Sequence, residues 1–200
     1  MILKRSLART GTRFLPALTV AILLTRFLPI WTPVWAAVTF DNATDLGTTT
    51  GTSLSGSHTM GAGSGGILFV CIHSPAVSIN VNNVSGVTFN SVALTEDIDT
   101  HSSGDTGYNA QIWRLNGPAS GSHTLAITLS STSAVISAHV VSYTGAASTG
   151  QPDASHSVGT GCCPTTGTDS VTTVTANDWG VSCTWGQFAQ PTISTGLVNS

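Results

Sequence analysis

The sequence predicts an all-β protein: an antiparallel two-sheet β-sandwich, Ig-like or jelly roll, preceded by an N-terminal signal helix. Short runs of alternating apolar and polar residues recur after residue 36, and turn-forming residues separate them at close spacing. No convincing helical period appears in that part of the chain. We therefore expect a signal peptide over residues 1–36 and one β-sandwich domain over residues 37–200.

The first 36 residues have the organisation of a secretory signal peptide. A basic segment precedes the apolar run FLPALTVAILLT, and Val34 and Ala36 are small residues at the −3 and −1 positions of a cleavage site. Arg26 and three prolines interrupt the span 14–36, which favours cleavage over membrane anchoring. We expect the mature chain to begin at Ala37, to be secreted or held at the cell surface, and to have no membrane contact once the signal is removed.

Beyond the signal, strands are expected wherever apolar alternation or a short apolar run lies between turn residues. ILFVCIH is apolar on both faces and predicts a central strand, and Asn90 predicts the turn after VSGVTF. The expected strands before the acidic segment are 37–40, 53–60, 67–73, 78–81, 84–89 and 91–94, and those near the C-terminus are 171–175 and 179–185.

The clearest strand signal lies between residues 108 and 143, in three extended segments separated by NGPASGS and SSTS. In the middle segment Leu125, Ile127 and Leu129 alternate with Thr124, Ala126 and Thr128. We expect a meander with one buried face. The tail 186–200 is too short for another hairpin, which predicts an open sheet edge and a homo-oligomer formed through it; in the alternative, residues 192–198 form a closing strand in a monomer.

Charge excludes two classes of partner. Five of the six basic residues lie in the first 26 positions, and all nine acids lie beyond position 40, so the region after residue 36 has one positive and nine negative charges, a net of −8. Its single cation, Arg114, cannot neutralise a series of phosphates, which excludes nucleic acid and anionic lipid as partners.

The segment LTEDIDTHSSGDTG concentrates carboxylates in what we expect to be a loop over residues 96–107. Carboxylate oxygens are the ligands that Ca²⁺ prefers, although the spacing departs from the EF-hand pattern. A solvated acidic loop without a metal is the interpretation we favour, so we expect no cofactor. Calcium is the alternative, and its candidate ligands are Glu96, Asp97, Asp99 and Asp105.

Four cysteines in an exported chain permit disulfides with three possible connectivities. Cys162 and Cys163 are adjacent, whereas Cys71 and Cys183 each lie within an apolar strand and could equally be buried thiols. We expect at least one bridge. The six histidines show no metal-binding spacing, and no set of nucleophile, base and orienting residue is visible, so we expect no enzymatic activity.

Five aromatic residues on or beside the expected strands are expected to pack in the core, with a platform for sugar rings as the alternative. These residues are Tyr108, Trp113, Trp179, Trp185 and Phe188.

Two motifs support a resemblance over residues 66–185. Pro118-x-x-Gly121-x-x-Thr124 leads into an alternating strand, and Val140-Val141-Ser142-Tyr143-x-Gly145 follows it. In these motifs the chain resembles a β-sandwich module of secreted bacterial and phage surface proteins. The resemblance implies an exported adhesive, carbohydrate-binding or structural module without catalytic residues. We therefore expect a non-enzymatic surface module, with a carbohydrate-binding module, calcium-dependent or not, as the alternative; the expected partner is a surface glycan or another protein.

Overall fold

A computed structural model describes residues 37–74, 83–100, 110–156, 170–172, 178–184 and 192–198. The chain divides into two units, residues 1–35 and 36–200, of which the first lies outside the described residues together with the expected signal peptide. Every regular element in the described part is a β-strand. The strands are β1 (Thr39–Met60), β2 (Ile67–His73), β3 (Val84–Phe89), β4 (Val92–Ala93), β5 (Thr95–Asp99), β6 (Ala110–Asn116), β7 (Gly121–Thr144), β8 (Asp178–Thr184) and β9 (Thr192–Val198).

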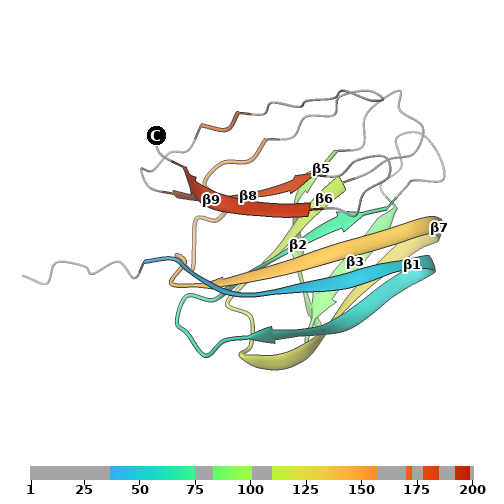
Figure 1. The fold of residues 1–200 in the computed structure, drawn as a ribbon, viewed down its shortest axis with the longest axis horizontal. Helices are drawn as coiled ribbons and strands as arrows, with labels where there is room; N and C mark the ends of the chain where they lie inside the picture. Colours follow the sequence, from blue (N-terminus) through green and yellow to red (C-terminus); the bar gives the residue numbers. More distant parts are fainter. Residues whose placement is uncertain are drawn as a thin grey trace, which may run out of the picture. The chain divides into compact units, whose positions relative to one another are not determined.

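Seven strands form one antiparallel sheet in the order β4-β3-β7-β2-β6-β5, and β1 pairs with β7 along its length. The two longest strands, β1 and β7, form a ribbon, and β2 and β3 pair with β7 of this ribbon (Figure 1). β3 pairs with the first part of β7, over Leu125–Leu129, and β2 pairs with its last part, over Ser137–Tyr143. The sheet curls into a nearly closed, barrel-like form because these two groups of strands diverge from the same ribbon.

The ribbon bends where its register is irregular. β1 shifts register between Asp45 and Thr48 and again on both sides of Gly51, and Gly47 and Gly51 have positive φ angles of 73° and 124°. Only glycine adopts such angles without a steric penalty, so the polar, glycine-containing sequence of β1 supplies the bulges that curve it.

The bend in β7 is held from outside the strand by Asn83, which is fully buried. Its side-chain oxygen accepts hydrogen bonds from the backbone N–H and the hydroxyl of Ser131, at 3.2 and 2.6 Å, and its backbone oxygen accepts one from the N–H of Ser130 at 2.8 Å. The SSTS segment is therefore anchored within a continuous strand.

The main hydrophobic core lies between the two groups of strands. Thr124 and Thr128 of β7 are exposed, whereas Leu125, Ile127 and Leu129 are buried, which confirms the predicted alternation in this strand. The core includes Leu68, Val70 and Ile72 of β2; Val84, Val87 and Phe89 of β3; Trp113 of β6; and Leu125, Ile127, Leu129, Ile136, Ala138 and Val140 of β7.

β8 and β9 form a second, two-stranded antiparallel sheet. This pair packs against the opposite face of β2 and β7 from the main core, where Val181 contacts a smaller apolar cluster of Ile67, Val141 and Tyr143. Because β9 is present at Thr192–Val198, the chain contains the strand proposed in the monomer alternative. The predicted oligomer through an open edge stays a prediction.

The all-β antiparallel class and the strands at 67–73 and 84–89 are confirmed, as is the turn at Asn90, where Asn90 and Ser91 have positive φ angles between β3 and β4. The prediction of a meander over residues 108–143 was wrong. β7 is one strand rather than two, and β2 lies between β6 and the second half of β7, so β6 and β7 are not neighbours in the sheet although they follow one another in the sequence. Residues 39–40 of the strand expected at 37–40 and the whole segment expected at 53–60 belong to the single strand β1. The expected strand at 78–81 lies outside the described residues.

Candidate functional site

The acidic segment begins as a strand, not as the expected loop. Residues 95–99 form β5 at the edge of the sheet, and a bulge between Glu96 and Ile98 sets Asp97 apart from the regular pairing with β6. Asp97 accepts hydrogen bonds at 2.7 and 3.1 Å from Nε and Nη2 of Arg114. The two side chains are only 7 and 9% exposed, so the one cation after residue 36 is held in a buried, two-point ion pair.

The ion pair involves one of the four candidate calcium ligands. Asp97 gives both carboxylate oxygens to Arg114, and Glu96 and Asp99 lie on β5, while Asp105 lies outside the described residues. Within the described ranges, no three His, Cys, Asp or Glu side chains gather in a group able to hold a metal ion. The calcium site stays a prediction, because one of its four candidate ligands lies outside the described residues.

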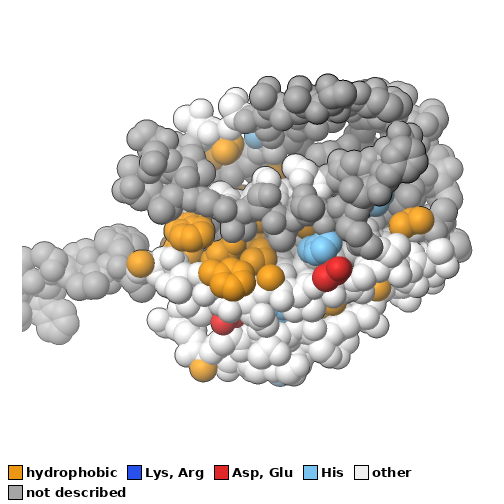
Figure 2. Space-filling view, in the orientation of Figure 1, with side chains coloured by type: hydrophobic (Ala, Val, Ile, Leu, Met, Phe, Trp, Pro, Cys, Tyr) orange, Lys and Arg blue, Asp and Glu red, His pale blue; other side chains and the backbone are white. Residues whose placement is uncertain are grey.

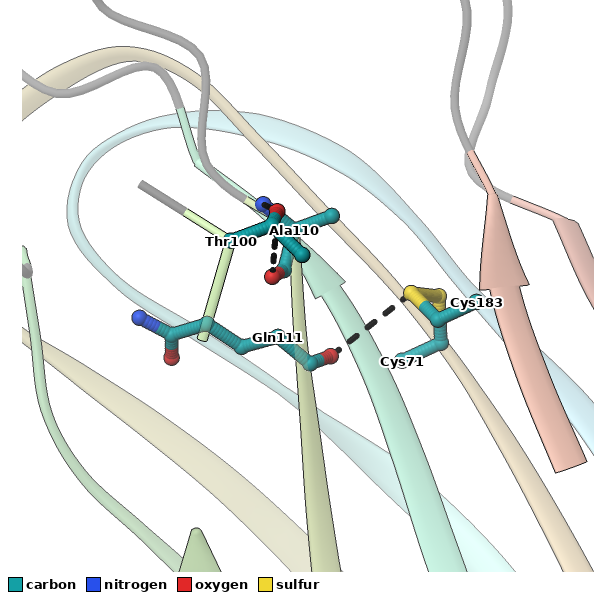
Figure 3. Close-up of a disulfide and its surroundings, with 5 residues drawn as sticks. All are labelled: Cys71, Thr100, Ala110, Gln111 and Cys183. Carbon is teal, nitrogen blue, oxygen red and sulfur yellow. Dashed lines mark hydrogen bonds between the residues drawn. A yellow bond between two sulfur atoms is a disulfide. The ribbon is translucent and has the colours of Figure 1, made fainter. Parts of the chain in front are cut away.

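A disulfide joins Cys71 of β2 to Cys183 of β8, with their Cα atoms 5.5 Å apart (Figure 3). Cys71 is fully buried, and the Cys183 sulfur lies 3.6 Å from the backbone oxygen of Gln111 on β6. The bond fastens the two-stranded sheet to the centre of the seven-stranded one. The other two candidates, Cys162 and Cys163, lie outside the described residues.

A chain of hydrogen-bonded polar side chains connects the two ends of β1 with the last part of β7. His58 and Ser142 are buried, with His58 Nε2 lying 3.0 Å from Ser142 Oγ. Ser142 donates its hydroxyl proton to Asp41 at 2.7 Å, so its oxygen accepts the proton on Nε2. Nδ1 of the same imidazole then accepts from the Thr44 hydroxyl at 2.8 Å, and the Gly61 N–H donates to Asp41 at 2.8 Å.

Serine, histidine and aspartate are the residue types of a hydrolytic triad, but their order here is different. In a triad the carboxylate orients the imidazole and the imidazole accepts the serine proton, whereas here the serine stands between the two. Burial lowers the pKa of His58 below its usual value, and the charge of Asp41 opposes that shift only in part. With the hydroxyl buried and its proton directed to Asp41, the arrangement stabilises the ribbon and offers no nucleophile to a substrate.

Aromatic side chains from three strands lie together near the start of β1, the end of β7 and the start of β8. The ring of Phe40 lies edge-on to that of Tyr143, with centroids 6.1 Å apart, and Trp179 lies against the same ring at 5.5 Å. Tyr143 is buried beneath the other two, whereas Phe40 is 55% and Trp179 37% exposed. We call these three residues the aromatic patch.

A polar pair lies on the same face of the ribbon. Phe40 is paired with Tyr143, Ala43 with Val141, and Asp45 with His139, so the three pairs form a row. The Asp45 carboxylate lies 3.7 Å from His139 Nε2, and the Asp45 side chain is 55% exposed. Figure 2 shows hydrophobic side chains gathered on this face, with a histidine and an acidic side chain beside them.

Sequence reasoning found only part of this face. It named Trp179, but Trp113 is a core residue whose indole N–H donates to Gln111, and Tyr108, Trp185 and Phe188 lie outside the described residues. It missed Phe40, Tyr143 and Asp45. The apolar alternation over residues 37–40 was a usable signal for Phe40, but the pairing of β1 with the end of β7 was not readable from the sequence.

Among the described residues, none forms a helix of the length and apolarity needed to cross a membrane. No protein-family model matches the chain, and no curated protein or solved structure shows significant similarity to it.

Proposed function

We propose that this chain is a non-enzymatic, exported β-module that binds surface material through its aromatic patch. The observation that supports this most directly is the exposure of Phe40 and Trp179, two large apolar side chains placed around one buried ring. Exposed and clustered aromatic side chains are typical of binding surfaces, because they combine large contact area with little conformational freedom.

Two further features support the proposal. A disulfide between the two sheets is a device of oxidising compartments, which agrees with a cleaved signal over residues 1–36 and a mature start at Ala37. In addition, the Ser142, His58 and Asp41 group has the residue types for hydrolysis, but its geometry and burial serve the fold. Both features favour an exported binding or structural role over catalysis.

The test is binding by the full chain, expressed for export and collected after processing. The fluorescently labelled protein is incubated with intact Gram-negative cells and with their isolated envelopes, and bound protein is measured after washing. We expect saturable binding that Trp179→Ala lowers at least tenfold, while Val92→Ala, which alters an exposed residue on β4, leaves it unchanged. Absence of saturable binding by the parent protein contradicts the proposed function.

A further inference from the structure

We infer that the aromatic patch and the Asp45–His139 pair form one elongated site for a neutral oligosaccharide, lying along the outer face of the β1–β7 ribbon. This inference rests on the proposed binding function and adds the class of ligand. The ligand's apolar ring faces lie on Phe40 and Trp179, and its hydroxyl groups contact the exposed carboxylate of Asp45 beside His139.

The length of the site follows from the strand register. Tyr143 and His139 are four residues apart on one strand, and a strand rises about 3.3 Å per residue, so the aromatic and polar ends are separated by roughly 13 Å. A compact ligand held by the aromatic rings does not reach the carboxylate. An extended ligand of several rings contacts both ends, and between them lies the small, exposed side chain of Ala43.

The charges near the site select a neutral ligand. Arg114 is the only Lys or Arg after residue 36, and its guanidinium is committed to Asp97, so an anionic ligand has no guanidinium or ammonium group to meet there. A small cation held over the aromatic rings is too far from Asp45 for the carboxylate to assist. A sugar chain can interact with both the aromatic and the polar end of the site, since its C–H faces stack on aromatic rings and its hydroxyl groups donate to a carboxylate.

The position of the site on a sheet face also favours a saccharide over an extended peptide. A peptide strand recognised by a sheet pairs with the free N–H and C=O groups of an edge. The patch is made by side chains that project from paired strands, where the backbone groups of Tyr143 and His139 already face β1 on one side and β2 on the other. A ligand on this face is recognised by side chains, as sugar rings are.

The experiment is isothermal titration of the exported full chain with neutral oligosaccharides of glucose and of N-acetylglucosamine, one to five units long. We expect affinity to rise with chain length and then to level off once both ends are occupied. Phe40→Ala and Trp179→Ala should each lower affinity at least tenfold and Asp45→Asn severalfold, whereas Val92→Ala should leave it unchanged.

Each variant is first checked by thermal melting, and Phe40→Ala serves if Trp179→Ala does not fold, because Phe40 is the more exposed of the two. Failure of every neutral oligosaccharide to bind overturns the inference, as does binding that neither aromatic variant weakens. Cell-surface binding that survives periodate oxidation of the glycans but is lost after protease treatment overturns the saccharide ligand while leaving the proposed binding function intact.

Discussion

Removing the Cys71–Cys183 bond should cost a large part of the stability of this fold. The two cysteines are separated by 112 positions, and the chain-entropy relation for a loop of that size gives about 5 kcal/mol at 25 °C. Total stabilities of domains are about 5–15 kcal/mol, so the loss is a substantial fraction. For a chain of this size, about 2–4 °C of melting temperature corresponds to each kcal/mol, which predicts a decrease of roughly 10–20 °C for Cys71→Ala with Cys183→Ala.

The assay compares thermal and urea unfolding of that double variant with the parent and with Cys162→Ala/Cys163→Ala, which removes the same number of cysteines. Peptide mapping of the unreduced parent should recover a Cys71–Cys183 cross-link, and the control variant should keep it. If the double alanine variant melts within about 2 °C of the parent, the two sheets do not depend on this bond and the reasoning from loop entropy is wrong. A cross-linked peptide containing only one of the two residues contradicts the pairing itself.

Three other predictions follow from buried groups. Leu125→Asp should unfold the domain, because an unpaired buried carboxylate costs several kcal/mol, whereas Thr124→Asp should be mild; equal melting temperatures for the two variants would contradict the alternation. Asp97→Asn should destabilise by about 3–5 kcal/mol, since it leaves Arg114 buried without a counter-charge, and this loss should be the same in calcium and in chelator; a calcium-dependent loss would support a metal site instead. Because burial lowers the pKa of His58, the unfolded chain binds a proton that the folded chain does not: this contribution to stability is present above about pH 6.5 and is lost as pH falls toward the folded pKa. Urea unfolding between pH 7.5 and 5 should show a slope of up to about 1.4 kcal/mol per unit that His58→Gln reduces, and identical slopes would refute the assignment.

Local sequence patterns predicted the positions of several strands well, but they predicted the pairing of strands within the sheet poorly. The runs at 67–73 and 84–89 were found because apolar residues bounded by turns have few alternatives to a strand. The pairing was missed because SSTS has the composition of a turn, yet Asn83 holds it extended by hydrogen bonds. That interaction joins residues far apart in the sequence, so no local pattern records it.

The polar sequence of β1 misled for a related reason. Residues 41–66 contain many Ser, Thr and Gly residues and little alternation, which is typical of a connecting segment. In the structure this composition suits a long, bent strand, because Gly47 and Gly51 supply the bulges and the hydroxyl of Thr44 contributes to a buried hydrogen-bond chain. The charged segment 95–99 misled similarly, since its acidic residues occupy a partly exposed edge strand.

The core and the proposed binding face are two sides of one strand. In the last part of β7, Ala138 and Val140 point into the main core, while His139, Val141 and Tyr143 point to the other face, where the aromatic patch and the polar pair lie. Because these residues alternate along one strand, the packing that holds the core-facing side chains in place also fixes the distances between the outward-facing ones. The disulfide extends this coupling to Trp179, because it fastens β8 over the same face. Loss of the Cys71–Cys183 bond should accordingly weaken oligosaccharide binding more than loss of an equal amount of stability through Asp97→Asn, which alters β5 at the edge of the sheet and leaves Trp179 in place.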